Sequence, residues 1–137
     1  MYQAGTLSAN PVGMRAGLAT LHKMDRMNGW QTLNERTAQF CAQLSAAFDA
    51  IHAGIDVVSH ASIFWLRLKS EHPVRRVDQI PERQRAWYGT FFHAALRRGV
   101  YLPPAGFEVC FVSMAHDTDT LRTTTDALAA AAEEAKG

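Results

Sequence analysis

Segments with helical periodicity alternate with short β-prone segments along this chain, and this order limits the possible fold more than any other feature. Proline and glycine mark the boundaries: Asn10-Pro11 and Pro81-Glu82 stand at two helix starts, and Gly54 and Gly99 follow two helical patterns. Asparagine is a preferred N-cap, and proline fits the first helical turn because its missing N–H would have no partner there. The predicted order is helix, helix, strand, strand, helix, strand, strand, helix.

Apolar residues at spacings of three and four define the helices. In the first helix Met14, Leu18 and Leu21 share one face, and Gly29 is expected to close the helix in a left-handed cap. The predicted helices cover residues 11–28, 30–53, 81–98 and 117 onward. The predicted strands cover residues 55–58, 63–68, 100–102 and 108–114, with Arg67 facing outward from the second strand.

These elements predict an α+β fold, because the strands are too few for a doubly wound sheet. We expect a small antiparallel or mixed sheet with helices packed on one face. The other face of such a sheet needs cover, and it is a natural seat for another domain.

The composition narrows the functional classes. The chain has 137 residues, a formal net charge of +1 and 47% hydrophobic residues, which indicates one globular domain and argues against nucleic acid or an acidic membrane as a partner. No apolar run approaches the roughly 18 residues of a membrane helix, and no signal pattern opens the chain. Cys41 and Cys110 have no paired spacing and the histidines are scattered, so we expect buried thiols in a reducing cytoplasm and no metal site.

The segment from Gly5 to Pro11 is the first candidate for chemistry. A glycine lets backbone N–H groups approach a ligand, Thr6 adds a hydroxyl donor, and a helix N-terminus follows, a combination that suits a phosphate. The alternative is that Ser8 and Asn10 only cap the helix. Spacing alone favours capping, because no lysine or further glycine completes a P-loop.

A second candidate is Glu108, a lone acid after a proline-rich turn and between apolar segments. This carboxylate either points into a cleft as an acid or hydrogen-bond acceptor, or it is a solvated turn residue. Ser62 precedes a strand and has no obvious base, so a nucleophilic role is not expected. His116 and Asp117 resemble a catalytic pair, but Asp117 is better placed as the N-cap of the last helix.

Lysines are placed unfavourably for covalent cofactor chemistry. Lys23 lies at a helix end, Lys69 at a strand end and Lys136 near the C-terminus. None of these positions offers the desolvated setting that a Schiff-base lysine requires.

Several blocks together resemble one enzyme family. Residues Tyr2–Pro11 and Ala16–Leu21 are similar to the segment that follows the cofactor lysine in class III aminotransferases, and Ser62–Phe64 resembles a strand start of that family. Gly99–Glu108 and Phe111–His116 resemble the closing motif of its aminomutases, the glutamate-1-semialdehyde aminomutases. The blocks keep their order and spacing across nearly the whole chain.

The resemblance implies a specific fold and activity. It implies fold type I, in which a small C-terminal domain packs on a large pyridoxal 5'-phosphate domain within a homodimer. Residues 1–28 would then be an interdomain loop and linking helix, and residues 29–137 the C-terminal small domain. The implied enzyme is an isomerase that converts a small-molecule substrate, glutamate 1-semialdehyde, into 5-aminolevulinate for tetrapyrrole and porphyrin biosynthesis.

The resemblance also implies roles for individual residues. Gly5 and Thr6 take the places that contact the phosphate of the neighbouring subunit's cofactor, which reverses the preference for capping alone. Glu108 takes the place of a glutamate at the mouth of the active site, and Ser62 that of a residue near the substrate.

The chain also departs from the family pattern. Ala9, Ile63 and Cys110 replace a usual glycine, methionine and glycine, which could stiffen the loop and alter the fit of the substrate. The cofactor lysine would lie upstream of Met1, so this chain alone is expected to be inactive and to bind no pyridoxal phosphate. Its implied partners are the N-terminal cofactor-binding domain and a second subunit, and without the large domain an exposed apolar patch favours self-association. Another class III aminotransferase and a non-catalytic dimerisation module remain the alternatives.

Overall fold

A computed structural model describes Gly5 and residues 7–136, which divide into two compact units. The first unit extends to Thr32, and the second begins at Leu33, inside helix α2 (Gly29–Ala50). None of the described helices is long and apolar enough to cross a membrane.

The first unit is built around α1 (Pro11–Arg26). The side chain of Asn10 caps this helix by accepting hydrogen bonds from two backbone amides of the first turn. The left-handed residue after the helix is Asn28, with φ of 49°, so the prediction that Gly29 forms this cap is wrong. Asparagine tolerates the left-handed region. Gly29 instead opens α2, where a Cβ atom would lie 2.7 Å from the methyl carbon of Met24.

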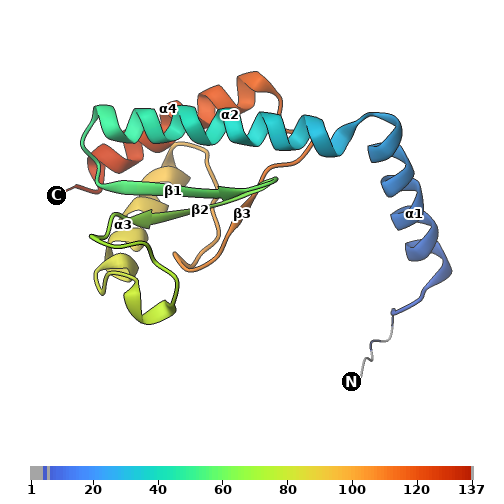
Figure 1. Cartoon of the computed structure of the whole chain (residues 1–137), viewed down its shortest axis with the longest axis horizontal. Helices are drawn as coiled ribbons and strands as arrows, with labels where there is room; N and C mark the ends of the chain where they lie inside the picture. The colour runs from blue at the N-terminus through green and yellow to red at the C-terminus, as the bar shows by residue number, and fades with distance from the viewer. Residues whose placement is uncertain (1–4, 6, 137) are drawn as a thin grey trace. The chain divides into compact units, whose positions relative to one another are not determined.

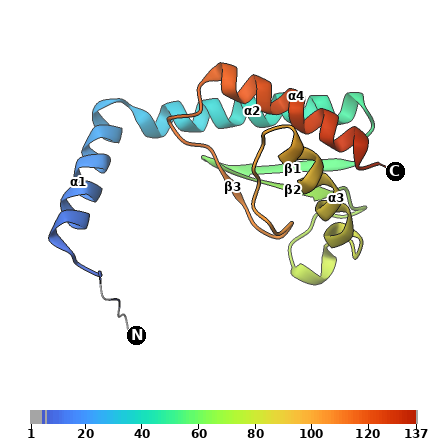
Figure 2. The ribbon, with the colours of Figure 1, turned by 180° about the vertical axis from the view of Figure 1, so that it is seen from behind.

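The second unit has a sheet of three antiparallel strands in the order β1 (Ile55–His60), β2 (Ile63–Leu68) and β3 (Cys110–Phe111). Ile55 pairs with Leu68, and Ile63 pairs with Phe111. Figures 1 and 2 show α2 and α4 (Thr118–Glu134) on the same side of this sheet. The α+β prediction is confirmed, with the sheet antiparallel throughout.

The core lies between this sheet and the helices. The ring of Phe64 on β2 packs edge-on against Phe40 of α2, with centroids 5.4 Å apart. Phe48 of α2 meets Phe91 of α3 (Gln84–Arg97) in a similar edge contact of 6.4 Å. Phe48 and Phe91 are fully buried, and each such burial contributes about 1.5–3 kcal/mol to the free energy of unfolding.

The opposite face of the sheet carries apolar side chains. Alternation along the strands and the pairing register put Val58, Ile63, Trp65 and Phe111 on this face. Phe111 is 70% exposed and Val58 46% exposed, so much of this apolar surface has no cover within the described residues.

Two predicted strands differ from the structure. Residues 100–102 form no strand, and the strand predicted for 108–114 is reduced to Cys110–Phe111. Pro103 and Pro104 have no N–H to donate, so no ladder continues through them. After Phe111 a single further bond, from the amide of Val112 to the carbonyl of Ser62 (2.8 Å), precedes a turn.

Two smaller predictions also need correction. The third helix begins at Gln84, because Pro81–Arg83 forms a turn closed by a 2.8 Å bond from the Gln84 amide to the Pro81 carbonyl. Arg67 lies on the outer face but is buried rather than facing solvent. Its guanidinium pairs with Asp56 at 2.6 Å and donates to the hydroxyl of Ser70 at 2.9 Å.

Candidate functional site

The predicted phosphate segment forms a tight turn ahead of α1. The Ser8 amide donates to the Gly5 carbonyl at 3.0 Å, and the Asn10 amide donates to the Leu7 carbonyl at 3.2 Å. A Cβ atom on Gly5 would lie 2.7 Å from the Ser8 hydroxyl oxygen, so this hydroxyl lies where a side chain at position 5 would begin. Thr6, the other predicted contact, lies outside the described residues.

The N-terminus of α1 itself has little capacity left for an anion. The Asn10 carboxamide oxygen accepts from the amides of Val12 (3.0 Å) and Gly13 (3.2 Å), and its backbone carbonyl accepts from Met14 (2.9 Å). Pro11 has no amide proton. An anion at this end therefore depends on the preceding turn, where the amides of Leu7 and Ala9 have no acceptor among the described residues.

That turn contains a strained residue. Ala9 has a φ of 59°, in the left-handed region. For a residue with a Cβ this conformation costs about 1–2 kcal/mol. The usual glycine of the resembling family would adopt it without this cost.

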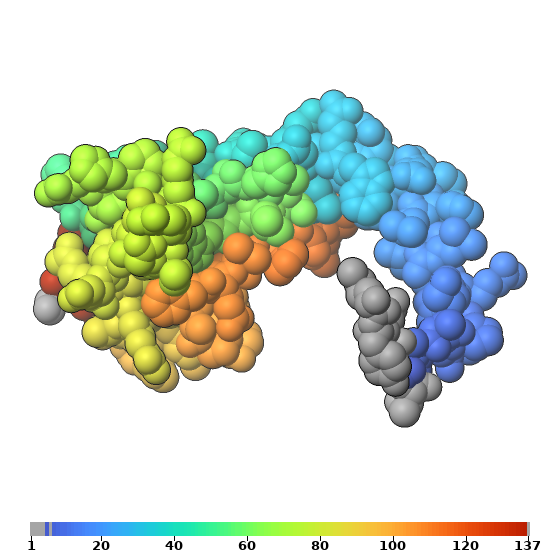
Figure 3. Space-filling model, turned by 60° about the horizontal axis from the view of Figure 1, so that its bottom comes forward, coloured from blue at the N-terminus to red at the C-terminus, as the bar shows by residue number. Residues whose placement is uncertain are grey.

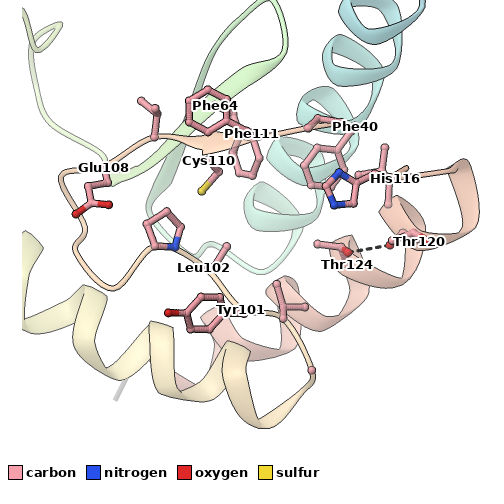
Figure 4. A pocket seen from close by; sticks show the side chains of 16 residues that line it. Phe40, Phe64, Tyr101, Leu102, Glu108, Cys110, Phe111, His116, Thr120 and Thr124 are labelled. Atoms are coloured by element: carbon pink, nitrogen blue, oxygen red, sulfur yellow. Dashed lines mark hydrogen bonds between the residues drawn. The ribbon is translucent and has the colours of Figure 1, made fainter. Parts of the chain in front are cut away.

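A pocket of about 620 Å³ opens in the second unit, between the segment from Gly99 to Pro103 and the flank of β3. Figure 4 shows the carboxylate of Glu108 at one end, His116 at the other, and the Cys110 side chain between them. The remaining lining is largely apolar and comes from all layers of the unit: Phe40, Phe64, Tyr101, Leu102, Val109, Phe111, Val112 and Leu121, among others.

The pocket combines an exposed carboxylate with largely apolar walls. Burial, and secondarily the charge of a Cys41 thiolate, raise the pKa of Cys110 to about 12, so its thiol stays protonated and is no nucleophile near neutral pH. The Glu108 carboxylate is exposed and has no hydrogen-bond partner within the described part of the chain. This carboxylate is therefore free to accept a hydrogen bond from, or exchange a proton with, a bound molecule.

The turn that carries Glu108 is held from two elements. The Gly106 carbonyl accepts from Gln84 Nε2 on α3 (3.0 Å) and from Trp65 Nε1 on β2 (2.9 Å). The Tyr88 hydroxyl, also on α3, donates to the Pro103 carbonyl at 2.8 Å. Figure 3 shows the orange part of the chain, which includes this turn, on the surface of the second unit.

The other candidate residues lie elsewhere. Ser62 is half-buried within the β1–β2 turn, and the pocket lining does not include it, so the described structure does not bring it to Glu108. Asp117 accepts a 2.8 Å bond from the Thr120 amide, which confirms it as the N-cap of α4. His116 Nδ1 accepts from the Ser113 amide at 3.0 Å instead of pairing with Asp117.

Two lysines are committed to ion pairs. Lys69 contacts Asp49 at 2.7 Å, and this hydrogen bond raises the pKa of the ammonium group. A lysine that forms a Schiff base needs a lowered pKa, so the environment of Lys69 acts in the opposite direction. Lys136 pairs with Glu133. Among the described residues no group of three potential metal ligands occurs.

The supporting residues Gln84, Tyr88 and Trp65 were not expected from the sequence. Gln84 and Tyr88 extend the stripe of Phe91 and Ala95 backward along α3 at spacings of four and three. The glutamine in this apolar stripe was the one sequence signal for these contacts, because a buried polar side chain requires hydrogen-bond partners.

No protein-family model matches the sequence. Individual proteins do match the sequence. The chain is similar to glutamate-1-semialdehyde 2,1-aminomutase of Bdellovibrio bacteriovorus, with 44% identity over 133 residues, which cover 97% of this chain and 31% of that protein. The protein of the same name from Leptospira biflexa is 45% identical over 125 residues, covering 90% of this chain and 29% of its own length. The chain thus spans about a third of the length of these relatives.

Solved structures agree with this similarity. An omega-transaminase from Sphaerobacter thermophilus matches 100% of this chain with a TM-score of 0.84 and 26% identity, over 31% of its own length. A transaminase with pyridoxal phosphate bound matches 98% of the chain with a TM-score of 0.78, and at 17% identity this match supports the fold alone. The chain is therefore homologous to the C-terminal domain of the glutamate-1-semialdehyde 2,1-aminomutases.

Proposed function

We propose that this chain is the C-terminal domain of a cytoplasmic, pyridoxal phosphate-dependent aminomutase that converts glutamate 1-semialdehyde into 5-aminolevulinate for tetrapyrrole biosynthesis. The observation that carries the proposal is the 44% identity to the Bdellovibrio aminomutase across 97% of the chain. The omega-transaminase similarity, at 26% identity, supports the wider family less specifically.

The turn before α1 fits the phosphate of the cofactor. The Ser8 hydroxyl lies close to Gly5, and the amides of Leu7 and Ala9 in this turn lack acceptors among the described residues. Oriented backbone amides of this kind bind phosphate well. We propose that Gly5 and Thr6 contact the phosphate of a cofactor bound by the second subunit of a homodimer.

We propose that the chemistry of amino transfer comes from a part of the protein that corresponds to the rest of the matched relatives. Pyridoxal phosphate held there by a lysine would supply the electron sink that moving an amino group requires. Because Lys69 is held protonated by Asp49, it is a poor candidate for that lysine. We therefore expect the chain alone to be inactive.

Glu108 would act at the substrate. Its exposed carboxylate stands at the rim of an apolar pocket, where it is able to accept a hydrogen bond from a substrate amino group or hold a proton. Phe111 and Val58 on the exposed sheet face would dock against the cofactor-binding domain, because that contact would remove their apolar surface from water.

The proposal is tested by reconstitution. This chain is co-expressed with the part of the Bdellovibrio aminomutase that precedes the matched third, and the purified complex receives pyridoxal phosphate and glutamate 1-semialdehyde. We expect 5-aminolevulinate from the complex and none from either half alone. A second complex carries Glu108→Gln, which keeps the size of the side chain but removes its charge, and so tests the role of Glu108.

The second candidate is an aminotransferase, favoured by the omega-transaminase similarity. A complex that aminates a keto acid from an amine donor, while making no 5-aminolevulinate, would replace the first proposal by this one. A complex that forms but binds no cofactor would instead support a non-catalytic dimerisation role.

A further inference from the structure

Part of one edge of the central strand β2 is covered by no other strand among the described residues. β3 pairs with β2 only at Ile63 and Phe64, so the same edge continues past β3 at Leu66 and Leu68. Both residues are buried, with 1% and 5% of their surface exposed. Buried backbone groups require partners, and at this edge the partners cannot come from a strand.

A single side chain supplies these partners. Gln84 Oε1 accepts from the Leu68 amide at 2.8 Å, and Gln84 Nε2 donates to the Leu66 carbonyl at 3.2 Å. A primary carboxamide carries a donor and an acceptor side by side, as a strand offers them to its neighbour. Gln84 therefore replaces a short piece of missing strand.

The same amide group also binds the turn. Its nitrogen donates a second bond to the Gly106 carbonyl at 3.0 Å, two residues before Glu108. Gln84 is fully buried, and both of its amide protons and its oxygen are used. One side chain thus fixes the distance between the edge of β2 and the turn.

We propose that Gln84 is a positioning residue for Glu108: by joining the β2 edge to the Gly106 carbonyl, it sets where the Glu108 carboxylate stands at the pocket. The functional part of this inference rests on the proposed role of Glu108. Glutamate at position 84 would turn a second oxygen toward the Leu66 and Gly106 carbonyls in place of a donor. Methionine would keep the approximate volume but lose all three bonds.

The structural part is tested in the full chain by amide hydrogen exchange. In Gln84→Met we expect the amides of Leu68 and Glu108 to exchange at least about tenfold faster. The Leu68 amide loses its acceptor, and the turn that carries the Glu108 amide loses its bond to Gln84. Gln43→Met, at an exposed position on α2, is the matched control and should change neither. Unchanged protection of both amides in Gln84→Met would overturn the proposal.

A milder variant guards against a chain that does not fold. Trp65→Phe keeps a ring at this position but removes the other donor to the Gly106 carbonyl. We expect faster exchange at Glu108 in this variant and unchanged exchange at Leu68, whose partner is Gln84. Equal acceleration at both amides would show general loosening and would contradict a specific link through Gln84.

The functional part is tested in the reconstituted enzyme by a double-mutant cycle. Gln84→Met should lower kcat/KM about tenfold or more when Glu108 is present, and have little further effect on a Glu108→Gln enzyme. Equal fold losses in both backgrounds, or full activity of Glu108→Gln, would overturn the positioning role. If the wild-type complex makes no 5-aminolevulinate at all, the proposed function fails, while the exchange experiment still decides whether Gln84 holds the turn.

Discussion

Replacing Gly106 by alanine tests how tightly the turn that carries Glu108 is packed. A Cβ atom at this position would lie 2.6 Å from Cγ and 2.8 Å from Cβ of Tyr88. These atoms are at the base of a buried ring whose hydroxyl is bonded to the Pro103 carbonyl, so the ring has no simple way to move aside. The turn must shift instead.

The expected cost follows from the contacts that the shift disturbs. Overpacking of this kind costs about 1–3 kcal/mol. The displaced turn also weakens the bonds from Gln84 and Trp65 to the Gly106 carbonyl and from Tyr88 to Pro103, each contributing about 0.5–1.5 kcal/mol. Because the turn will relax partly, we expect Gly106→Ala to lower the free energy of unfolding by about 3 kcal/mol.

Gly89→Ala is the matched control, on the same helix as Tyr88. A Cβ atom on Gly89 meets nothing within 4 Å, and alanine within a helix should stabilise the chain by about 0.5–1 kcal/mol. Urea unfolding followed by tryptophan fluorescence measures both variants. If Gly106→Ala unfolds within about 0.5 kcal/mol of the wild type, the range typical of surface changes, the tight packing of the turn against Tyr88 is refuted.

Three further outcomes are expected. Ala9→Gly should relieve about 1 kcal/mol of left-handed strain, and amide exchange within that turn should slow; unchanged exchange would argue against the strain. Cys41 and Cys110, whose pKa values burial raises, should not react with a thiol reagent at pH 8 until the chain unfolds. The bond from the Thr120 amide lowers the pKa of the Asp117 carboxyl below its unfolded value, so its contribution to stability is present above the unfolded pKa, about 4, and is lost as the pH falls through the folded pKa. Asp117→Asn keeps the cap but not this titration, so its stability should fall less steeply in acid.

The fold was predictable where local patterns decide it. The hairpin of β1 and β2 lies within two residues of its predicted bounds, because alternating β-branched and aromatic residues followed by polar ones mark a half-buried strand. Val100–Leu102 has equally β-prone residues but forms no strand. Whether a segment pairs depends on a free edge elsewhere, and at β2 the edge is taken by Gln84.

The residues of the candidate site were likewise predictable only where a local sequence pattern marks them. A lone acid after a proline-rich turn and between apolar segments marks Glu108 as a candidate, and it does line the pocket. Its roles with substrate, and those of Gly5, Thr6 and Ser62, stay predictions. The residues that hold the turn were missed, because Gln84 meets Gly106 across 22 positions of sequence and no local pattern encodes that contact.

The turn before α1 has a feature that helix capping does not require. Helix capping accounts for Asn10, whose side chain takes the amides of Val12 and Gly13. Capping gives no reason for a left-handed Ala9. Strained residues persist where the surroundings or a ligand offset their cost, and they gather at binding sites. A bound phosphate would offset the strain by pairing with the turn amides, so the conformation of Ala9 favours binding over capping alone.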